Sequence, residues 1–248
     1  MSKSKLAAPQ MVTNSRMIYT SWIPADPTAA AKLLPPALQP AANGAIYMNQ
    51  YVVDSAEQTT GFGAYSLTYL GLDVADHPAP DGVTPGRFFT HYFNSSEIVR
   101  EYAAERGVPA SPGRTTVEVR DGVVTATTYV DERPIIRTTA TVGDQADLIL
   151  AGHLRYITQV KDRLVSGNYP YIGELVTQFA VRSIEFLDPT HPVYALRPAT
   201  PLQVVAGSSF FAPRDSFVYP GGEYDMGPAD PREKVQVHRV AMPHLAGA

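Results

Sequence analysis

The chain has 248 residues, of which 44% are hydrophobic and 18% charged. This composition is enough for a sizeable core and excludes a disordered protein. The net charge is −4, no run of Lys or Arg occurs, and cysteine is absent, which argues against nucleic-acid binding and excludes disulfides and thiolate chemistry.

The N-terminal stretch contains lysines but no apolar segment after them, so it does not have the pattern of a signal peptide. No apolar run approaches the roughly 20 residues that a membrane-spanning helix needs. We therefore expect a cytoplasmic protein without a membrane or nucleic-acid partner.

Residues 1–15 are expected to form a flexible arm, and residues 16–248 a single domain. A short helix is expected near 27–34, because Asp26 can cap it and Pro27 suits its first position.

Segments rich in β-branched and aromatic residues, bounded by Gly, Pro or Asp, predict most of the remaining chain to be strands. These segments are 44–54, 61–73, 87–93, 114–120, 122–130, 134–142, 172–187, 193–197, 202–212 and 216–219. The dipeptide Asp121-Gly122 predicts a tight hairpin, and the segment 74–87, rich in Pro and Gly, predicts a loop.

A second helix is expected over 95–106, where Asn94 and Glu97 have the spacing of a capping box. The segment 144–162 is ambiguous and could be a loop followed by a helix. Many strands, few helices and no alternation of the two predict a β-rich α+β fold, with a curved antiparallel sheet or barrel and a few peripheral helices.

The order of these segments resembles the acetoacetate decarboxylase superfamily over roughly residues 16–220. The matching stretches are RMIYTSWIPADPTAAAKLLPPALQ (16–39), GFGAYSL (61–67), EIVREYAAERGVP (97–109), GELVTQF (173–179) and PLQVVAGSSFFAPRDSFVYP (201–220). The resemblance implies that family's barrel and a homo-oligomer.

In that family a lysine forms a Schiff base with a substrate ketone, next to a second lysine, two glutamates and an arginine. By this resemblance Arg16 takes the place of the arginine, Met48 and Leu67 those of the glutamates, and Glu105 and Arg106 that of the lysine pair. Arginine stays protonated and cannot supply a neutral amine, so the resemblance implies a divergent member that lacks the Schiff-base lysine.

Four residues are candidates for catalysis. Arg16 could clamp a carboxylate or an enolate oxygen, although a structural salt bridge is the alternative. Glu105 could be a general base and Arg106 an oxyanion donor, but Glu105 continues a four-residue repeat of glutamates that is typical of a solvated helix face. Tyr65 could donate a hydrogen bond or simply pack.

Five further residues are candidates for binding substrate: Met48, Gln50, Leu67, His91 and Tyr92. Strand alternation that turns Met48 inward also turns Gln50 inward, whereas only one of His91 and Tyr92 can reach a cavity. Spacing among the six histidines does not suggest a metal site, and no cofactor motif is present.

We therefore expect an enzyme that acts on an organic acid, a ketone or a polyketide-like substrate by acid/base chemistry without a Schiff base. A cyclase, dehydratase or C–C lyase of secondary metabolism fits. Two alternatives stay open: a non-catalytic small-molecule binding protein, and a true acetoacetate-type decarboxylase in which Lys161 reaches the site.

Overall fold

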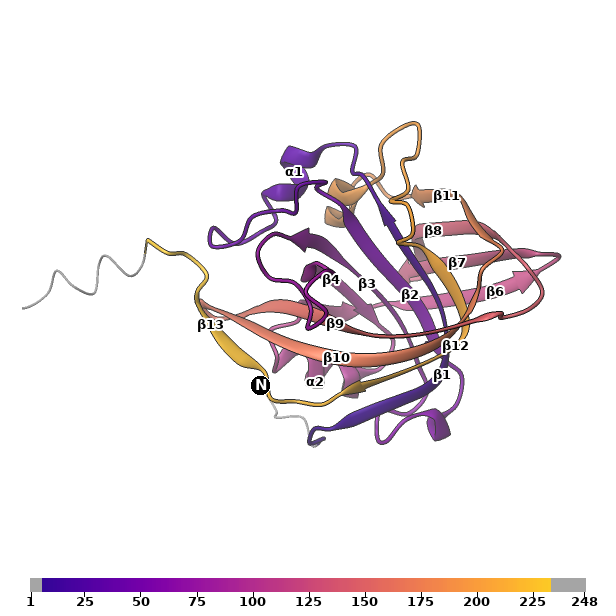
Figure 1. Cartoon of the computed structure of the whole chain (residues 1–248), viewed down its shortest axis with the longest axis horizontal. Coiled ribbons are helices and arrows are strands. Elements are labelled where there is room, and N and C mark those ends of the chain that lie inside the picture. The colour runs from indigo at the N-terminus through magenta and orange to yellow at the C-terminus, as the bar shows by residue number, and fades with distance from the viewer. Residues whose placement is uncertain (1–5, 233–248) are drawn as a thin grey trace, which may run out of the picture.

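A computed structural model describes residues 6–232 and has a closed β-barrel at its centre (Figure 1). Seven strands form the barrel, in the order β12-β1-β2-β3-β4-β9-β10 and back to β12. Their bounds are β1 (Gln10–Trp22), β2 (Ile46–Val53), β3 (Tyr65–Val74), β4 (Gly86–Asn94), β9 (Leu148–Val160), β10 (Arg163–Val176) and β12 (Phe210–Tyr219). Neighbouring strands are antiparallel except β4 and β9, which run parallel where they meet. The predicted β-rich barrel is confirmed.

A second, four-stranded sheet packs against the outside of the barrel. It has the order β11-β8-β7-β6, with bounds β6 (Arg114–Arg120), β7 (Val123–Val130), β8 (Arg133–Val142) and β11 (Phe179–Phe186). The predicted hairpin is present, because Asp121 and Gly122 connect β6 to β7 with positive φ angles at both positions. Short strands β5 (Ala110–Pro112) and β13 (Tyr224–Pro228) extend β4 and β10.

Both predicted helices are present, but the second begins differently from expectation. Asp26 caps α1 (Pro27–Ala31) as its sequence indicates. The N-cap of α2 (Glu97–Ala104) is Ser96, whose hydroxyl accepts from the backbone of Val99, and the side chain of Asn94 instead accepts from the backbone of Ser96. The expected capping box between Asn94 and Glu97 is therefore wrong.

Three other expectations about local structure are corrected. Residues 10–15, assigned to the flexible arm, form the first part of β1 and pair with β12; residues 1–5 lie outside the described part of the chain. The ambiguous segment 144–162 contains the long strand β9, and 193–197 falls in the 3-10 helix Pro192–Leu196. Local pattern missed these elements because partner strands and packing decided them.

Two barrel strands, β2 and β3, are buried on both faces, and the two faces pack into different cores. Every residue of β2 and of β3 is buried. One face lines the barrel interior, where tyrosine and phenylalanine side chains gather, and the other packs against the four-stranded sheet. Val99, Tyr102 and Ala103 of α2 join the interior cluster, so this helix covers one end of the barrel.

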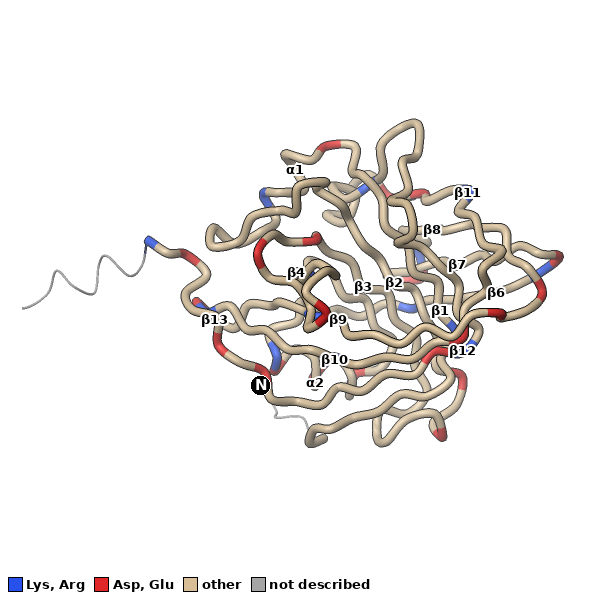
Figure 2. The backbone as a smooth tube through the Cα atoms, in the orientation of Figure 1, with Lys and Arg blue, Asp and Glu red and all other residues tan. Residues whose placement is uncertain are grey.

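Charged residues lie mostly in loops and near strand ends, with both signs interspersed (Figure 2). None of the helices in residues 6–232 has the length and apolar character needed to cross a membrane.

Gly71 tests how tightly the barrel wall is packed. It lies at a register shift between β3 and β4, and a Cβ atom there would overlap the backbone oxygen of Phe88 and approach the hydroxyl of Tyr47. A backbone oxygen cannot move without its strand, so we expect Gly71→Ala to lower the free energy of unfolding by about 3 kcal/mol. Urea denaturation measures this loss.

Gly61→Ala is the matched control. There an added Cβ meets only the far ends of the Leu6 and Gln10 side chains, which can turn aside, so the expected loss is below about 1 kcal/mol. Equal losses in the two variants would contradict the tight approach of β3 and β4.

Candidate active site

A cavity of about 350 Å³, here called the main cavity, lies inside the barrel. Cavities of about 300 to 1,000 Å³ typically hold small organic ligands. Aromatic residues form a large part of its wall, namely Tyr19, Tyr51, Tyr69, Tyr169, Tyr171, Phe210, Phe217 and Tyr219. Such a wall is apolar overall and also offers phenolic hydroxyl groups as hydrogen-bond partners.

A buried ion pair lies in the wall of this cavity. Asp73 on β3 and Arg87 on β4 are cross-strand partners, and Arg87 Nε donates to Asp73 Oδ1 at 3.3 Å. Only 12% of the Arg87 side chain and 9% of the Asp73 side chain are exposed. Burial raises the pKa of Asp73 above its ordinary value, and the charge of Arg87 opposes that rise.

The Arg87 guanidinium has hydrogen-bonding capacity left for a ligand. Asp73 accepts only from Nε of this guanidinium. Among residues 6–232, no side chain accepts a hydrogen bond from either of its two terminal nitrogens. Its carbon lies 5.0 Å from the centre of the Tyr19 ring and 5.2 Å from that of Tyr47. Burial lowers the pKa of Arg87, but the nearby Tyr19 and Asp73 raise it overall, so the group stays cationic.

Asp215 on β12 contributes a second, very different titratable group to the main cavity. Asp215 is only 3% exposed, and burial raises the pKa of its carboxyl to about 8. In the described part of the chain, no side chain pairs with this carboxyl; the nearby Arg214 pairs with Glu174 instead. Near neutral pH the Asp215 carboxyl is therefore largely protonated.

A row of polar groups crosses the cavity wall between these two sites. Asn49 Nδ2 donates to the Tyr69 hydroxyl at 3.2 Å, and that hydroxyl bonds the Tyr169 hydroxyl at 3.0 Å. The Oδ1 atom of Asn49 and the hydroxyl of Tyr19 are buried without a partner in residues 6–232. A buried polar atom without a partner is costly, so both atoms make this part of the wall less stable than a fully hydrogen-bonded one.

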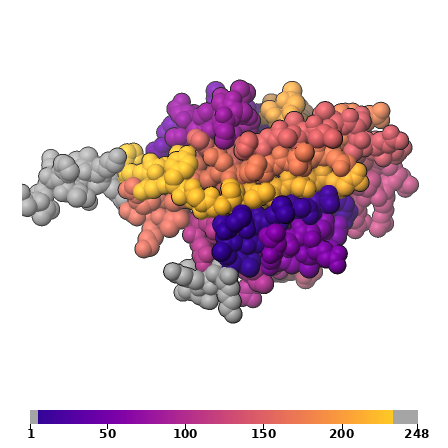
Figure 3. Space-filling view, turned by 60° about the horizontal axis from the view of Figure 1, so that its bottom comes forward, coloured from indigo at the N-terminus to yellow at the C-terminus, as the bar shows by residue number. Residues whose placement is uncertain are grey.

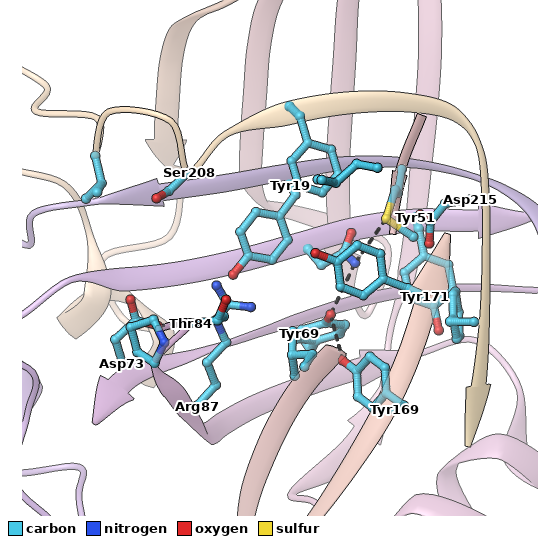
Figure 4. Close-up of a pocket in the computed structure, with 18 of the residues that line it drawn as sticks. Tyr19, Tyr51, Tyr69, Asp73, Thr84, Arg87, Tyr169, Tyr171, Ser208 and Asp215 are labelled. Atoms are coloured by element: carbon cyan, nitrogen blue, oxygen red, sulfur yellow. Dashed lines mark hydrogen bonds and ion pairs between the residues drawn. The ribbon is translucent and has the colours of Figure 1, made fainter. Parts of the chain in front are cut away.

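Figure 4 shows how these groups are arranged. Arg87 and Asp73 lie at one end of the cavity and Asp215 at the other, with Tyr69 and Tyr171 between them. The site can therefore hold an anionic group at one end of a ligand and exchange a proton at the other.

The structure places Arg16 away from the main cavity. Its Nε and NH2 atoms donate to Asp54 at 3.0 and 2.8 Å, and its NH1 donates to the backbone oxygen of Val117. The hydrogen bond with Asp54 raises the pKa of Arg16. This is the structural salt bridge that the sequence left open as the alternative to a substrate clamp.

Arg106 and Tyr92 come together in a second, much smaller pocket of about 30 Å³, here called the small pocket. Arg106 Nε donates to Glu223 at 2.8 Å, and its guanidinium lies 3.6 Å from the centre of the Tyr102 ring. Glu105 is the C-cap residue after α2, its side chain is 36% exposed, and it lines neither the main cavity nor the small pocket.

Met48 and Gln50 lie on the opposite face of β2 from the one expected. Gln50 Nε2 donates to Thr128 of the outer sheet at 2.9 Å, and Met48 packs in the core between the barrel and that sheet. Their neighbours Asn49 and Tyr51 line the main cavity instead. The predicted alternation is thus one residue out of phase, because β2 is covered on both faces.

Leu67 and Tyr65 do face the barrel interior, although neither lines the main cavity. The hydroxyl of Tyr65 bonds that of Tyr51 at 2.9 Å, and Tyr51 is part of the cavity wall. Tyr65 is therefore one hydrogen bond removed from a ligand in the cavity.

His91 points away from the barrel interior. Its ring stacks on Phe93, which belongs to the core outside the barrel, and its Nδ1 lies 3.0 Å from the Thr90 hydroxyl. Burial, aided by His191, lowers the pKa of His91 to about 4.

Neither lysine of the described chain lies at the cavity. Lys32 follows α1 and Lys161 is exposed in the turn between β9 and β10. Lys3, Lys5 and Lys234 lie outside the described residues. Nor does any group of three His, Asp or Glu side chains in residues 6–232 lie close enough together to hold a metal ion.

Sequence reasoning missed Arg87, Asp73 and Asp215. One signal could have found the first two: Asp73 ends a predicted strand, Arg87 begins the next, and a single loop connects them. Antiparallel neighbours joined in this way bring these two ends together. Asp215 fell in a gap between two predicted strands, so nothing marked it.

No protein-family model matches the chain, and no curated protein sequence matches it. Solved structures do. Acetoacetate decarboxylase from Legionella pneumophila is 14% identical with a TM-score of 0.65, and covers 91% of each chain. An acetoacetate decarboxylase-like enzyme from Sphingomonas wittichii is 17% identical with a TM-score of 0.61, over 92% of this chain and 99% of that one.

The enduracididine biosynthesis enzyme MppR, complexed with pyruvate, is 16% identical with a TM-score of 0.63, over 90% of this chain and 93% of that one. Each of these likenesses covers nine-tenths or more of this chain. The chain therefore has the acetoacetate decarboxylase-like fold, as the resemblance in its sequence predicted.

Proposed function

We propose that this chain is an enzyme that binds a small organic acid or ketone in the main cavity and acts on it by acid/base chemistry without a Schiff base. One observation carries the proposal: a buried cation with unused donors and a buried, unpaired carboxyl share the same aromatic cavity. A cyclase, dehydratase or C–C lyase would use both groups.

Arg87 is the group proposed to hold the anion. Its two free terminal nitrogens can donate to both oxygens of a carboxylate, or to an enolate oxygen as charge develops there. Asp73 fixes the guanidinium through Nε, so little rotational freedom is lost when the ligand binds.

Asp215 is the group proposed to move the proton. With a pKa of about 8 it is present in both forms at weakly alkaline pH. The carboxylate removes a proton from the carbon next to a carbonyl, and the electron pair left behind moves to the carbonyl oxygen. The carboxylic acid then returns that proton, either to carbon or to a departing hydroxyl group that leaves as water.

The structural neighbours suggest the first compounds to try. Solved structures hold MppR in complex with pyruvate, and with the condensation product of pyruvate and imidazole 4-carboxaldehyde. Small α-keto acids carry the anion and the carbonyl that the proposed site requires. Identities of 14–17% do not transfer those ligands to this chain, so pyruvate serves here as a probe.

A non-catalytic binding protein is the second candidate. It is favoured by the positions of Glu105 and Arg106, the acid/base pair expected from sequence, which do not line the main cavity. Proton exchange separates the two candidates: an enzyme that forms enolates replaces the methyl protons of pyruvate with deuterium in D₂O, whereas a carrier does not.

We expect NMR to show this exchange with the wild-type chain, and to show little of it with Asp215→Asn, which keeps the shape but cannot accept a proton. In parallel, incubation with pyruvate or acetoacetate followed by borohydride should leave the protein mass unchanged. A reduced adduct on any lysine would instead support the true decarboxylase. Absence of exchange under all conditions would support the carrier.

A further inference from the structure

One edge of β9 is open. Throughout its length β9 pairs with β10, from Leu148 opposite Leu175 to Val160 opposite Arg163. On its other side it meets β4 only at Tyr156 and the residue after it. Within residues 6–232, no strand pairs with that side of residues 148–152, here called the free edge. Alternate backbone N–H and C=O groups of the free edge therefore remain available.

The side chains of the free edge are apolar and exposed on both faces. Leu148, Ile149 and Leu150 are 46%, 70% and 37% exposed. Ile149 and Ala151 alternate with the cavity-facing residues, and Ala151 lies opposite Ile172 of β10, which is 53% exposed. Figure 3 shows the salmon atoms of β9 and β10 as an uncovered band of the surface.

Three other strand edges within residues 6–232 are protected in the ways that proteins usually protect them. β6 carries the exposed charges Glu118 and Arg120. β11 has a bulge between Val181 and Ser183. β13 is five residues long and ends in Pro228. The free edge of β9 has no charge, bulge or proline, so its apolar character stands out within the same molecule.

Charges on either side of the free edge suit pairing with itself. Asp144 and Asp147 precede it, whereas His153 and Arg155 follow it. Two copies related by a two-fold axis pair antiparallel, so the acidic end of one lies opposite the basic end of the other. Centred on Leu150, this pairing sets Asp147 opposite His153 of the second copy.

We propose that the free edge is an interface at which two copies of this chain join into one continuous antiparallel sheet. The partner that pairs with the free edge is a second copy of this chain, because the charges on either side of the edge are self-complementary. Residues 148–152 themselves carry no charges that would repel each other in such a pair. Leu150 lines the main cavity, so the second copy would also border the opening of the site. This inference does not depend on the proposed chemistry.

Sedimentation equilibrium tests the interface. The wild-type chain is expected to be a dimer, and the double variant Ile149→Lys/Ala151→Lys should raise its dissociation constant by about tenfold or more, because like charges then face each other across the two-fold axis. Val119→Lys is the control: Val119 is 47% exposed, on the charged edge strand β6, and should leave the dimer unchanged.

Single cysteines give an independent readout, because the chain has none of its own. Mild oxidation should link two copies through Leu150→Cys, because residue 150 lies opposite itself in this register, and not through Val119→Cys. A monomeric wild type at the highest soluble concentration would overturn the proposal. So would a dimer that the double lysine variant leaves intact.

Discussion

Arg87→Met is expected to weaken the binding of pyruvate by about a hundredfold or more, because a carboxylate in the cavity would lose its charged partner in a site shielded from water. Titration calorimetry at fixed ionic strength measures the change. Arg87→Lys should recover only part of the affinity, since an ammonium group cannot reproduce the two parallel hydrogen bonds of a guanidinium.

Arg16→Met is the matched control for this prediction. Arg16 is the arginine that the family resemblance selects, but it pairs with Asp54 near the surface, so its loss should leave ligand binding unchanged. Arg87→Met also leaves the buried Asp73 carboxylate without its ion-pair partner, which should lower the stability of the protein. The double variant Arg87→Met/Asp73→Asn removes that charge and should regain stability while still binding poorly.

The opposite result would be equally informative. If Arg16→Met abolished binding and Arg87→Met did not, the ligand would lie outside the main cavity, and the site would be the one that the sequence alone suggested. If both variants bound as the wild type does, neither arginine would hold the anion.

Strand content and fold class could be predicted because short-range signals were strong. Asp121-Gly122 fixes a hairpin by turn chemistry alone, since a two-residue hairpin turn of this type needs positive φ at both positions, which both residues have. Asp26 and Pro27 fix the start of α1 in the same local way. The order of segments then gave the barrel, because the resemblance rested on many weak matches in sequence order.

Inward-facing residues could not be predicted because the barrel wall has two apolar sides. Alternation of apolar and polar residues along a strand identifies its buried face only when the other face is exposed to solvent. In β2 both faces are buried, one against the cavity and one against the outer sheet, so Met48 and Asn49 look equally suited to the interior. The prediction was one residue out of phase, so it assigned Met48 and Gln50 to the cavity wall, whereas Asn49 and Tyr51 line it.

Long-range pairing explains the remaining misses. β9 and β12 are held by neighbours far away in sequence, and Asp215 on β12 becomes unusual only once Gly173 and Ser15 lie beside it. An aspartate in a polar stretch carries no sign that folding will bury it. Its chemistry is a property of the closed barrel and not of the local sequence.

Protein stability should fall as pH rises from about 4 to about 8, and Asp215 should be a main cause. Its carboxyl titrates at 3.8 in the reference state and at about 8 in the folded chain. Between these values the folded protein holds a proton that the unfolded chain has released, so unfolding releases a proton and is favoured at higher pH. The full effect is on the order of 5 kcal/mol.

Asp215→Asn isolates this contribution. The amide has the same shape and no proton to lose, so the variant should match the wild type near pH 4 and be more stable than it at pH 8. Asp73, whose pKa burial also raises, adds a dependence of the same sign, but both proteins share it and the difference between them removes it. Urea unfolding at several pH values measures the two curves.

Parallel stability curves would show that the Asp215 carboxyl is not held protonated, and the proposed base would then lack its physical basis. If the curves converge at low pH as expected, deuterium exchange into pyruvate should show the opposite trend and rise as pH approaches 8. The carboxylate that accepts the proton is the form that the cavity disfavours. Reactivity and instability would then grow together, because both come from the same buried, unpaired charge.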